Sequence, residues 1–190
     1  MRAFIGISLP QDVRASLAQV IGDLSRGTTG VRWVAPESLH ITLKFLGEIS
    51  EAQREPVEGL VRQAAATQRV FTARLESIGA FPSLRSPRVI WAGVADGAAS
   101  VAALAGTIEQ GCRRLGFSAE ERPFSAHVTL GRVASSRPDR SLIERLSSVA
   151  WEAPAPWPVT AVTVYRSHLA STGVRYETLA EAPLATGAAN

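Results

Sequence analysis

Two short segments, far apart in the chain, carry the same pattern of residues. The segments "LHITLKFLG" and "AHVTLGR" each contain a histidine, a β-branched residue, a threonine and a leucine, in that order. Side chains of a β-strand alternate between its two faces, so His40 should share a face with Thr42, and His127 with Thr129. The repeat therefore predicts a duplicated unit in which each copy presents an imidazole and a hydroxyl together on a strand.

Strict alternation also assigns the neighbouring residues. It places Lys44 on the same face as His40. The side chains predicted to face a core are Ile41, Leu43 and Phe45 in the first segment, and Val128 and Leu130 in the second.

The rest of the chain predicts an α+β fold in which helices cover sheets. Apolar and alternating runs predict strands at 2–9, 31–34, 39–46, 70–79, 87–94, 124–132, 159–168 and 174–181. Helical periodicity predicts helices at 11–25, 51–66, 98–115 and 139–149. Segments with proline and glycine predict loops at 80–87, 133–138 and 152–158. A chain of 190 residues fits one domain with two lobes, which we place at 1–184, with a frayed tail at 185–190.

Composition restricts the cellular setting. Cys112 is the only cysteine, so an internal disulfide is impossible and a reducing compartment is expected. No run approaches the roughly 20 apolar residues that a membrane span needs. The first ten residues are too short a hydrophobic segment, interrupted by Pro10, to form a signal peptide. We expect a cytoplasmic protein that does not bind membranes.

The charge is compatible with an anionic partner. The net charge is +3, and Lys44 is the only lysine among 20 basic residues. An arginine-rich chain can reflect genome composition, or it can reflect binding to phosphate, because guanidinium groups match phosphate oxygens. There is no basic run of the kind found in nucleic-acid-binding tails. Any phosphate site would have to be assembled by folding.

Paired histidines and threonines suit the chemistry of phosphate esters. Cleaving or closing such an ester requires one proton to be removed from an oxygen and another to be delivered. Histidine can do both near neutral pH, because its reference pKa is about 6.5. Threonine hydroxyls can hydrogen-bond the non-bridging phosphate oxygens. This chemistry requires no metal and no cofactor.

Beyond these two motifs, the chain resembles the 2H phosphoesterases, and among them the RNA 2′,3′-cyclic phosphodiesterases, historically called 2′-5′ RNA ligases. The resemblance covers nearly the whole chain and is carried by "RAFIGISLP", "RWVAPESLHITLKFLGEI", "PRVIWAGV", "ERPFSAHVTLGR" and "VTVYRSHLASTGVRYETL". It implies a bilobal fold of two antiparallel sheets facing a central cleft, with helices outside. One departure is Ala126, where the family often has proline.

The resemblance also implies the reaction and the roles of residues. The substrate would be RNA, or an oligonucleotide, ending in a 2′,3′-cyclic phosphate, and the product a 2′-phosphate. His40 would be the proton donor and His127 the acceptor, although the nearly symmetric motifs do not decide this by themselves. Further candidates for substrate binding are Thr42, Thr129, Arg132 and Lys44. We expect the protein to act as a monomer.

Aromatic residues could stack a terminal base. The candidates are Trp33, Phe45, Trp91 and Tyr165, although alternation favours a core position for Phe45. Arg166 and Ser167 fit either a functional or a structural role in the last strands. His168 has no threonine two residues later, and we interpret it as structural or exposed.

Three alternative functions remain open from the sequence. The same site could join a cyclic phosphate to a 5′-hydroxyl, which is 2′-5′ RNA ligation. The three histidines, His40, His127 and His168, could bind zinc, although their spacing does not favour this. The chain could also be an RNA-binding module with an inactive cleft, although binding alone would not need two titratable imidazoles.

Overall fold

The computed structural model describes residues 1–134, 139–170 and 173–187. Within these ranges the helices are α1 (Gln11–Ser25), α2 (Glu51–Thr67), α3 (Ala98–Arg114) and α4 (Arg140–Ser148), with one 3₁₀ turn, η1 (Pro36–Ser38). The strands are β1 (Arg2–Ser8), β2 (Val31–Trp33), β3 (His40–Glu48), β4 (Phe71–Ala73), β5 (Leu75–Ser83), β6 (Ser86–Val94), β7 (His127–Val133), β8 (Trp157–Val159), β9 (Ala161–Ala170) and β10 (Gly173–Pro183). All four predicted helices are confirmed to within one or two residues at their ends.

The strands form an 8-stranded sheet with the order β10-β9-β1-β3-β7-β6-β5, and β2 pairs with β7. Every pairing in this sheet is antiparallel. The sheet consists of two halves, and β3 of one half meets β7 of the other at the pair Ile41–Val128. The predicted α+β class is confirmed. The two antiparallel sheets expected from the resemblance are the two halves of one continuous sheet, joined edge to edge through β3 and β7. A separate 2-stranded sheet contains β4 and β8.

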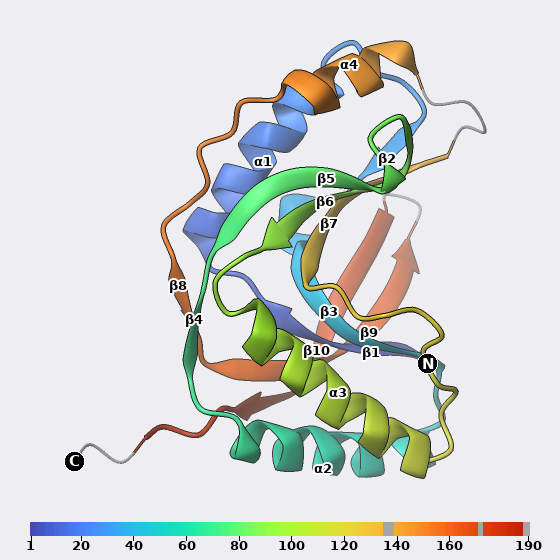
Figure 1. Ribbon diagram of the computed structural model, residues 1–190. Helices are drawn as coiled ribbons and strands as arrows, with labels where there is room; N and C mark the ends of the chain where they lie inside the picture. The colour runs from blue at the N-terminus through green and yellow to red at the C-terminus, as the bar shows by residue number, and fades with distance from the viewer. Residues whose placement is uncertain (135–138, 171–172, 188–190) are drawn as a thin grey trace.

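The helices form two pairs, α1 with α4 and α2 with α3, which lie at opposite ends of the view in Figure 1. Helix α2 packs against β9 and β10, whereas α3 packs against β3. Apolar faces of all four helices join one hydrophobic core with the inner residues of the strands. Ser50 and Gln53 form a reciprocal capping box at the start of α2, as their spacing suggests.

Some segments differ from the prediction. The predicted loop at 152–158 ends in a short strand, β8. The segment predicted as a loop at 80–87 is a hairpin, because β5 and β6 pair through Ser83 and Ser86. The predicted strand at 70–79 is two strands, β4 and β5. The predicted loop at 133–138 lies mostly outside the described residues.

The segment predicted as a frayed tail, 185–190, begins with a residue that is bonded to the rest of the fold. The amide of Ala185 donates to the Gln68 carbonyl at 2.9 Å, and its own carbonyl accepts from the Val70 amide at 3.1 Å. Residues 188–190 lie outside the described ranges. Across the described part of the chain, no helix has the length and apolar character needed to cross a membrane.

Candidate active site

The two histidine motifs meet at the junction between the halves of the sheet. Ile41 follows His40, Val128 follows His127, and these two following residues pair with each other. Both are 0% exposed, so their side chains face the core and the histidines face the opposite side. Extending the antiparallel register by one residue in each direction sets His40 opposite Thr129 and Thr42 opposite His127. The structure therefore brings the four predicted residues together.

Each imidazole is oriented in the same way by the backbone. His40 Nδ1 lies 2.8 Å from the Ser38 carbonyl, and His127 Nδ1 lies 2.7 Å from the Ser125 carbonyl. A carbonyl oxygen only accepts hydrogen bonds, so each Nδ1 carries a hydrogen and Nε2 is the atom available for proton transfer. In its neutral form, His40 accepts at Nε2 from the Thr42 hydroxyl, at 2.9 Å.

These bonds extend the repeat beyond what the sequence reading identified. A serine stands two residues before each histidine, but the bond uses its backbone carbonyl, which any residue could supply. Ala126, where the family often has proline, does not change the result, because the His127–Ser125 bond matches the His40–Ser38 bond.

A glycine lets β1 approach the first motif closely. Gly6 pairs with Thr42, and a Cβ atom at this position would lie 2.7 Å from the Ile41 carbonyl oxygen and 3.4 Å from Cδ2 of His40. Any larger residue would push against the strand that carries His40. Gly6 therefore helps to set the position of this imidazole.

Both motifs contain a β-bulge at their leucine. In β3, Thr42 pairs with Gly6 and Lys44 with Ile5, so Leu43 has no partner of its own. In β7, Thr129 pairs with Trp91 and Gly131 with Ile90, which leaves Leu130 unpaired in the same way. A bulge inserts one residue into a strand and reverses the alternation of the residues that follow. Strict alternation therefore fails after the leucine of each motif.

The bulge reverses the predicted positions of Lys44 and Phe45. Lys44 turns away from the histidines, is 5% exposed, and places Nζ 2.7 Å from a carboxylate oxygen of Glu109 and 2.8 Å from the Ser118 carbonyl. Phe45 turns toward the face that carries His40 and is 55% exposed. The predictions that Lys44 shares the face of His40 and that Phe45 lies in the core are wrong. The buried ion pair of Lys44 with Glu109 gives no support to its predicted contact with RNA.

Arg132 follows the second bulge and lies near both imidazoles. Burial lowers the pKa of His40, and the positive charges of Arg132 and His127 lower it further, against the hydrogen bond to Ser38. Burial likewise lowers the pKa of His127, with Arg132 contributing in the same direction and the bond to Ser125 opposing it. At neutral pH these lowered pKa values favour the neutral form of both imidazoles, which lie beside the permanent positive charge of Arg132.

An aromatic cluster surrounds His40. The ring of Phe4 lies 4.6 Å from His40, 4.9 Å from Tyr165 and 4.8 Å from Tyr176. Tyr176 also meets His40 edge-on, with ring centroids 5.2 Å apart. Burial raises the pKa of Tyr176, so its hydroxyl stays protonated at neutral pH. Tyr176 was not among the site candidates predicted from the sequence. The alternating pattern of the last predicted strand was the one feature that could have indicated that Tyr176 shares a face with other site residues.

A smaller aromatic pair lies beside His127. Phe81 meets the His127 ring edge-on at 5.3 Å and contacts Trp91 at 5.1 Å. Trp91 pairs with Thr129 and covers Gly79, where a Cβ atom would lie 2.3 Å from the indole. The sequence reading missed Phe81 because its segment was predicted to be a loop.

Comparison with known proteins identifies the family. The LigT-like phosphoesterase family matches the chain twice, over residues 7–91 and 93–176. The chain belongs to this family. Each match contains one of the two histidine motifs, which agrees with the duplication seen in the strands. The resemblance drawn from the sequence is confirmed.

Individual relatives of this LigT-like phosphoesterase agree. An RNA 2′,3′-cyclic phosphodiesterase of Archaeoglobus fulgidus is 37% identical over 76% of this chain and 80% of its own length. The crystal structure of TT0787 of Thermus thermophilus has a TM-score of 0.80 at 29% identity, covering 97% of this chain and 98% of that one. The structure of E. coli LigT complexed with 3′-AMP has a TM-score of 0.78 at 31% identity, covering 96% and 97%.

Other candidates lie away from the phosphoesterase site. Trp33 pairs with Gly131 and packs against the hydrophobic core. His168 pairs with Arg175, and its side chain lies on the face of β9 opposite to that of Tyr165. Its Nε2 lies 2.7 Å from a carboxylate oxygen of Glu177. The three histidines are therefore not brought together. Among the described residues, no group of three or more histidine, cysteine, aspartate and glutamate side chains could hold a metal ion.

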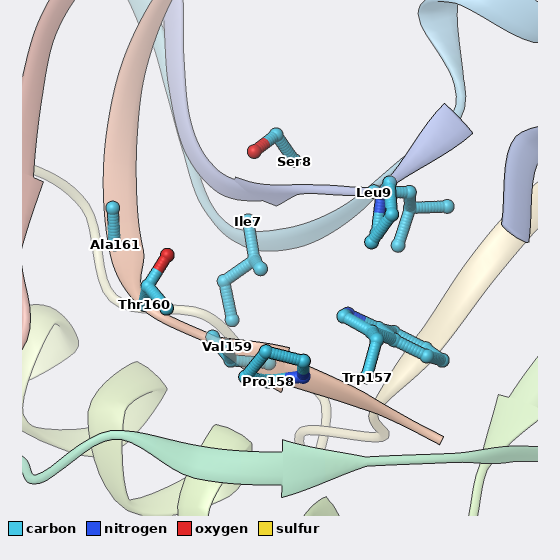
Figure 2. A pocket seen from close by; sticks show the side chains of 9 residues that line it. Ile7, Ser8, Leu9, Trp157, Pro158, Val159, Thr160 and Ala161 are labelled. Atoms are coloured by element: carbon cyan, nitrogen blue, oxygen red, sulfur yellow. The ribbon is translucent and has the colours of Figure 1, made fainter. Parts of the chain in front are cut away.

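A small hollow lies at the end of β1, near the site but not part of it. Its volume is about 180 Å³, and it lies between the end of β1 and the β8–β9 connection. Figure 2 shows Ile7, Leu9 and Trp157 among the side chains that line it. Neither His40 nor His127 lines this hollow, so we assign it no part in the site.

Proposed function

We propose that this LigT-like phosphoesterase hydrolyses 2′,3′-cyclic phosphate ends of RNA and leaves 2′-phosphates. The names of relatives support the substrate class, since proteins of Archaeoglobus fulgidus and Methanothermobacter thermautotrophicus that match over most of the chain are named RNA 2′,3′-cyclic phosphodiesterases. The observation that carries the proposal is the matched pair of imidazoles. Both have Nδ1 bound to a backbone carbonyl, and both therefore offer Nε2 on the same face of the sheet.

In the proposed reaction, His127 Nε2 accepts a proton from water as the water oxygen attacks phosphorus. His40 Nε2 donates a proton to the ribose 3′-oxygen as the bond from that oxygen to phosphorus breaks. The base must be neutral and the acid protonated at the start, and their states are exchanged at the end. A further proton exchange with solvent restores the site.

Thr42, Thr129 and Arg132 would hold the phosphate. The two hydroxyls lie diagonally opposite each other by the register of the central pair, and each can donate to a non-bridging oxygen. Arg132, whose charge reaches both histidines, is placed to stabilise negative charge that develops on those oxygens. None of these roles requires a metal.

The experiment is incubation of the purified protein with an RNA oligonucleotide that ends in a 2′,3′-cyclic phosphate. We expect hydrolysis, with the product phosphate assigned to the 2′-oxygen by ³¹P NMR, and an unchanged rate after exhaustive chelation. A 3′-phosphate product, or no product, would contradict the proposal. Adding an oligonucleotide with a free 5′-hydroxyl tests the alternative, because 2′-5′ ligation would give a longer product in place of the hydrolysed one.

We also propose that the protein acts as a monomer in a reducing compartment such as the cytoplasm. The two motifs that form the site come from one chain, and Cys112 is buried. Light scattering should therefore give a mass near 20.2 kDa at the concentrations used for activity. A mass of twice this value would contradict the monomer.

A further inference from the structure

Two arginines lie side by side on the face of the sheet that carries the histidines. Arg32 of β2 pairs directly with Arg132 of β7, and directly opposed residues of an antiparallel pair share a face. Val31 and Trp33, the chain neighbours of Arg32, pack against the core, so Arg32 points away from the core. Both arginines are exposed.

This arrangement leaves an excess of positive charge. Like charges directly opposite each other destabilise a pair of strands. The ion pairs formed between described residues include neither Arg32 nor Arg132. By contrast, Arg166 of β9 pairs with Glu177 of β10, whose carboxylate oxygen lies 3.9 Å from the guanidinium. An anionic ligand would balance the charge of Arg32 and Arg132.

The two cations lie at different distances from the histidines. Arg132 lowers the pKa of His40 and of His127, which places its charge beside the proposed position of the reacting phosphate. The charges that lower these pKa values do not include that of Arg32, so Arg32 lies farther from the imidazoles. Arg32 is therefore next to the phosphate-binding arginine but outside the place where bonds break and form.

The position of β2 in the sheet determines on which side of Arg132 this second cation lies. Strand β6 pairs with one edge of β7, so β2 and β3 pair one after the other with the opposite edge. The Val34 amide donates to the Leu130 carbonyl at 2.8 Å and continues the pairing of β2 toward β3. Arg32 is therefore on the same side of β7 as His40.

We propose that Arg32 binds the phosphodiester that joins the terminal nucleotide to the rest of the RNA. This inference rests on the proposed function. In the proposed reaction the 3′-oxygen of the terminal ribose lies at His40, so the ribose extends from the cyclic phosphate toward β3 and β2. The next phosphate is attached to the 5′-oxygen of the same ribose. Arg32, one strand away from Arg132 on that side, is placed to bind it.

The consequence is a preference for RNA ends over free cyclic mononucleotides. A cyclic mononucleotide has the reacting phosphate but no phosphodiester on its 5′ side, so it leaves Arg32 without an anion. Guanidinium groups form strong, charge-assisted hydrogen bonds to phosphate oxygens. The proposed contact is made to the phosphate backbone, so it should not depend on the base sequence.

The test uses three substrates with the same reacting group. They are adenosine 2′,3′-cyclic phosphate, the dinucleotide ApA ending in a 2′,3′-cyclic phosphate, and the same dinucleotide with an uncharged methylphosphonate linkage. In the wild type, kcat/KM should be on the order of 10-fold higher for the phosphodiester dinucleotide than for the methylphosphonate one. Arg32→Gln should abolish this difference, and Arg32→Lys should keep part of it because it keeps the charge.

Two further measurements separate this role from a structural one. Arg32→Gln should leave kcat/KM for the cyclic mononucleotide within about 2-fold of the wild type, and it should make the salt dependence for the phosphodiester dinucleotide shallower by about 0.7 in log–log slope. Thermal unfolding of Arg32→Gln should not occur at a lower temperature than that of the wild type, because the substitution removes a repulsion between like charges.

Arg114→Gln is the matched control, because it removes an exposed arginine from α3, a helix on the core side of the sheet. It should leave kcat/KM for all three substrates unchanged. Equal losses on the mononucleotide and the dinucleotide with Arg32→Gln would place Arg32 at the cyclic phosphate and overturn the assignment. A wild type without a preference for the charged linkage, or a preference that survives Arg32→Gln, would also overturn it. If the wild type hydrolyses none of the three substrates, the proposed function itself fails, which is a separate outcome.

Discussion

Ile41 and Val128 pair with each other at the centre of the sheet, and each is the residue that follows a motif histidine. Both are fully buried, so the pair fixes the two motif strands relative to each other from the core side. This pairing also sets the relative positions of the histidines and threonines on the opposite face. The sheet therefore aligns two sequence motifs that lie far apart in the chain.

The two threonines should contribute to turnover and not to folding. Thr42→Val and Thr129→Val keep a β-branched side chain suited to a strand and remove one hydroxyl each. Loss of a hydrogen bond to the transition state lowers kcat/KM on the order of 10²-fold. Steady-state kinetics with a cyclic-phosphate oligonucleotide provides the measurement, and thermal unfolding should stay within a few degrees of the wild type. Thr72→Val, at an exposed position in β4, is the control and should keep wild-type activity.

Lys44 should stabilise the fold and not bind the substrate. Lys44→Met leaves Glu109 without its partner and removes the bond to the Ser118 carbonyl, which anchors the segment that leads into β7. We expect the free energy of unfolding to fall by up to about 3 kcal/mol in urea titrations. The double variant Lys44→Met/Glu109→Gln should regain part of this loss.

The KM of Lys44→Met for an RNA substrate, and its dependence on salt, should stay close to the wild-type values. A rise in KM as large as that caused by replacing Arg132 would show that Lys44 contacts the RNA after all. This comparison separates a buried structural charge from one that binds phosphate.

Arg132 should affect both the rate and its dependence on pH. Arg132→Met should lower kcat on the order of 10²-fold, since it removes a charge that stabilises the transition state. Because Arg132 lowers the pKa of His40 and of His127, its removal should raise both values and move the pH optimum of kcat/KM upward. Arg132→Lys keeps the charge and should keep the optimum near that of the wild type. An unchanged optimum in Arg132→Met would contradict the electrostatic contact with the histidines.

The sequence predicted correctly which residues share a face up to the leucine of each motif. His40, Thr42, His127 and Thr129 lie on one face because alternation holds over three residues of a regular strand. It fails at Lys44 and Phe45, because a bulge depends on how the strand pairs with β1 and leaves no clear mark in the apolar pattern.

The helices were predictable because their apolar periodicity and caps are local features. The β5–β6 hairpin was not, because Pro82 and Pro87 indicate a loop when they are considered alone. Pro82 lies in β5, an edge strand, next to a register shift, and these are positions at which a sheet tolerates proline. The position of Phe81 beside His127 depends on that hairpin, and so does the second aromatic contact of the site.

Protonation of the histidines should destabilise the fold in mild acid. The folded-state pKa values of His40 and His127 lie below the ordinary value of 6.5, so the unfolded chain binds more protons between those values and 6.5. Stability should therefore fall as pH drops below about 6.5. Urea unfolding at pH 7 and pH 5 provides the measurement. A His40→Asn/His127→Asn variant should lose less stability over this range than the wild type. An equal loss in both proteins would contradict the lowered pKa values.

The central claim is that one histidine acts as acid and the other as base, and the pH–rate profile tests it most directly. The kcat/KM of the wild type on a 2′,3′-cyclic-phosphate oligonucleotide should follow a bell with its maximum below about pH 6.5, because both pKa values are lowered in the free protein. His127→Ala should lose the limb at low pH, which reports the base, and His40→Ala the limb at high pH. Each variant should retain only residual activity, and the double variant should be little worse than the poorer single one, since groups that act as a unit are not additive. A single variant that keeps full activity and the complete bell would show that its histidine takes no part in the proton transfers.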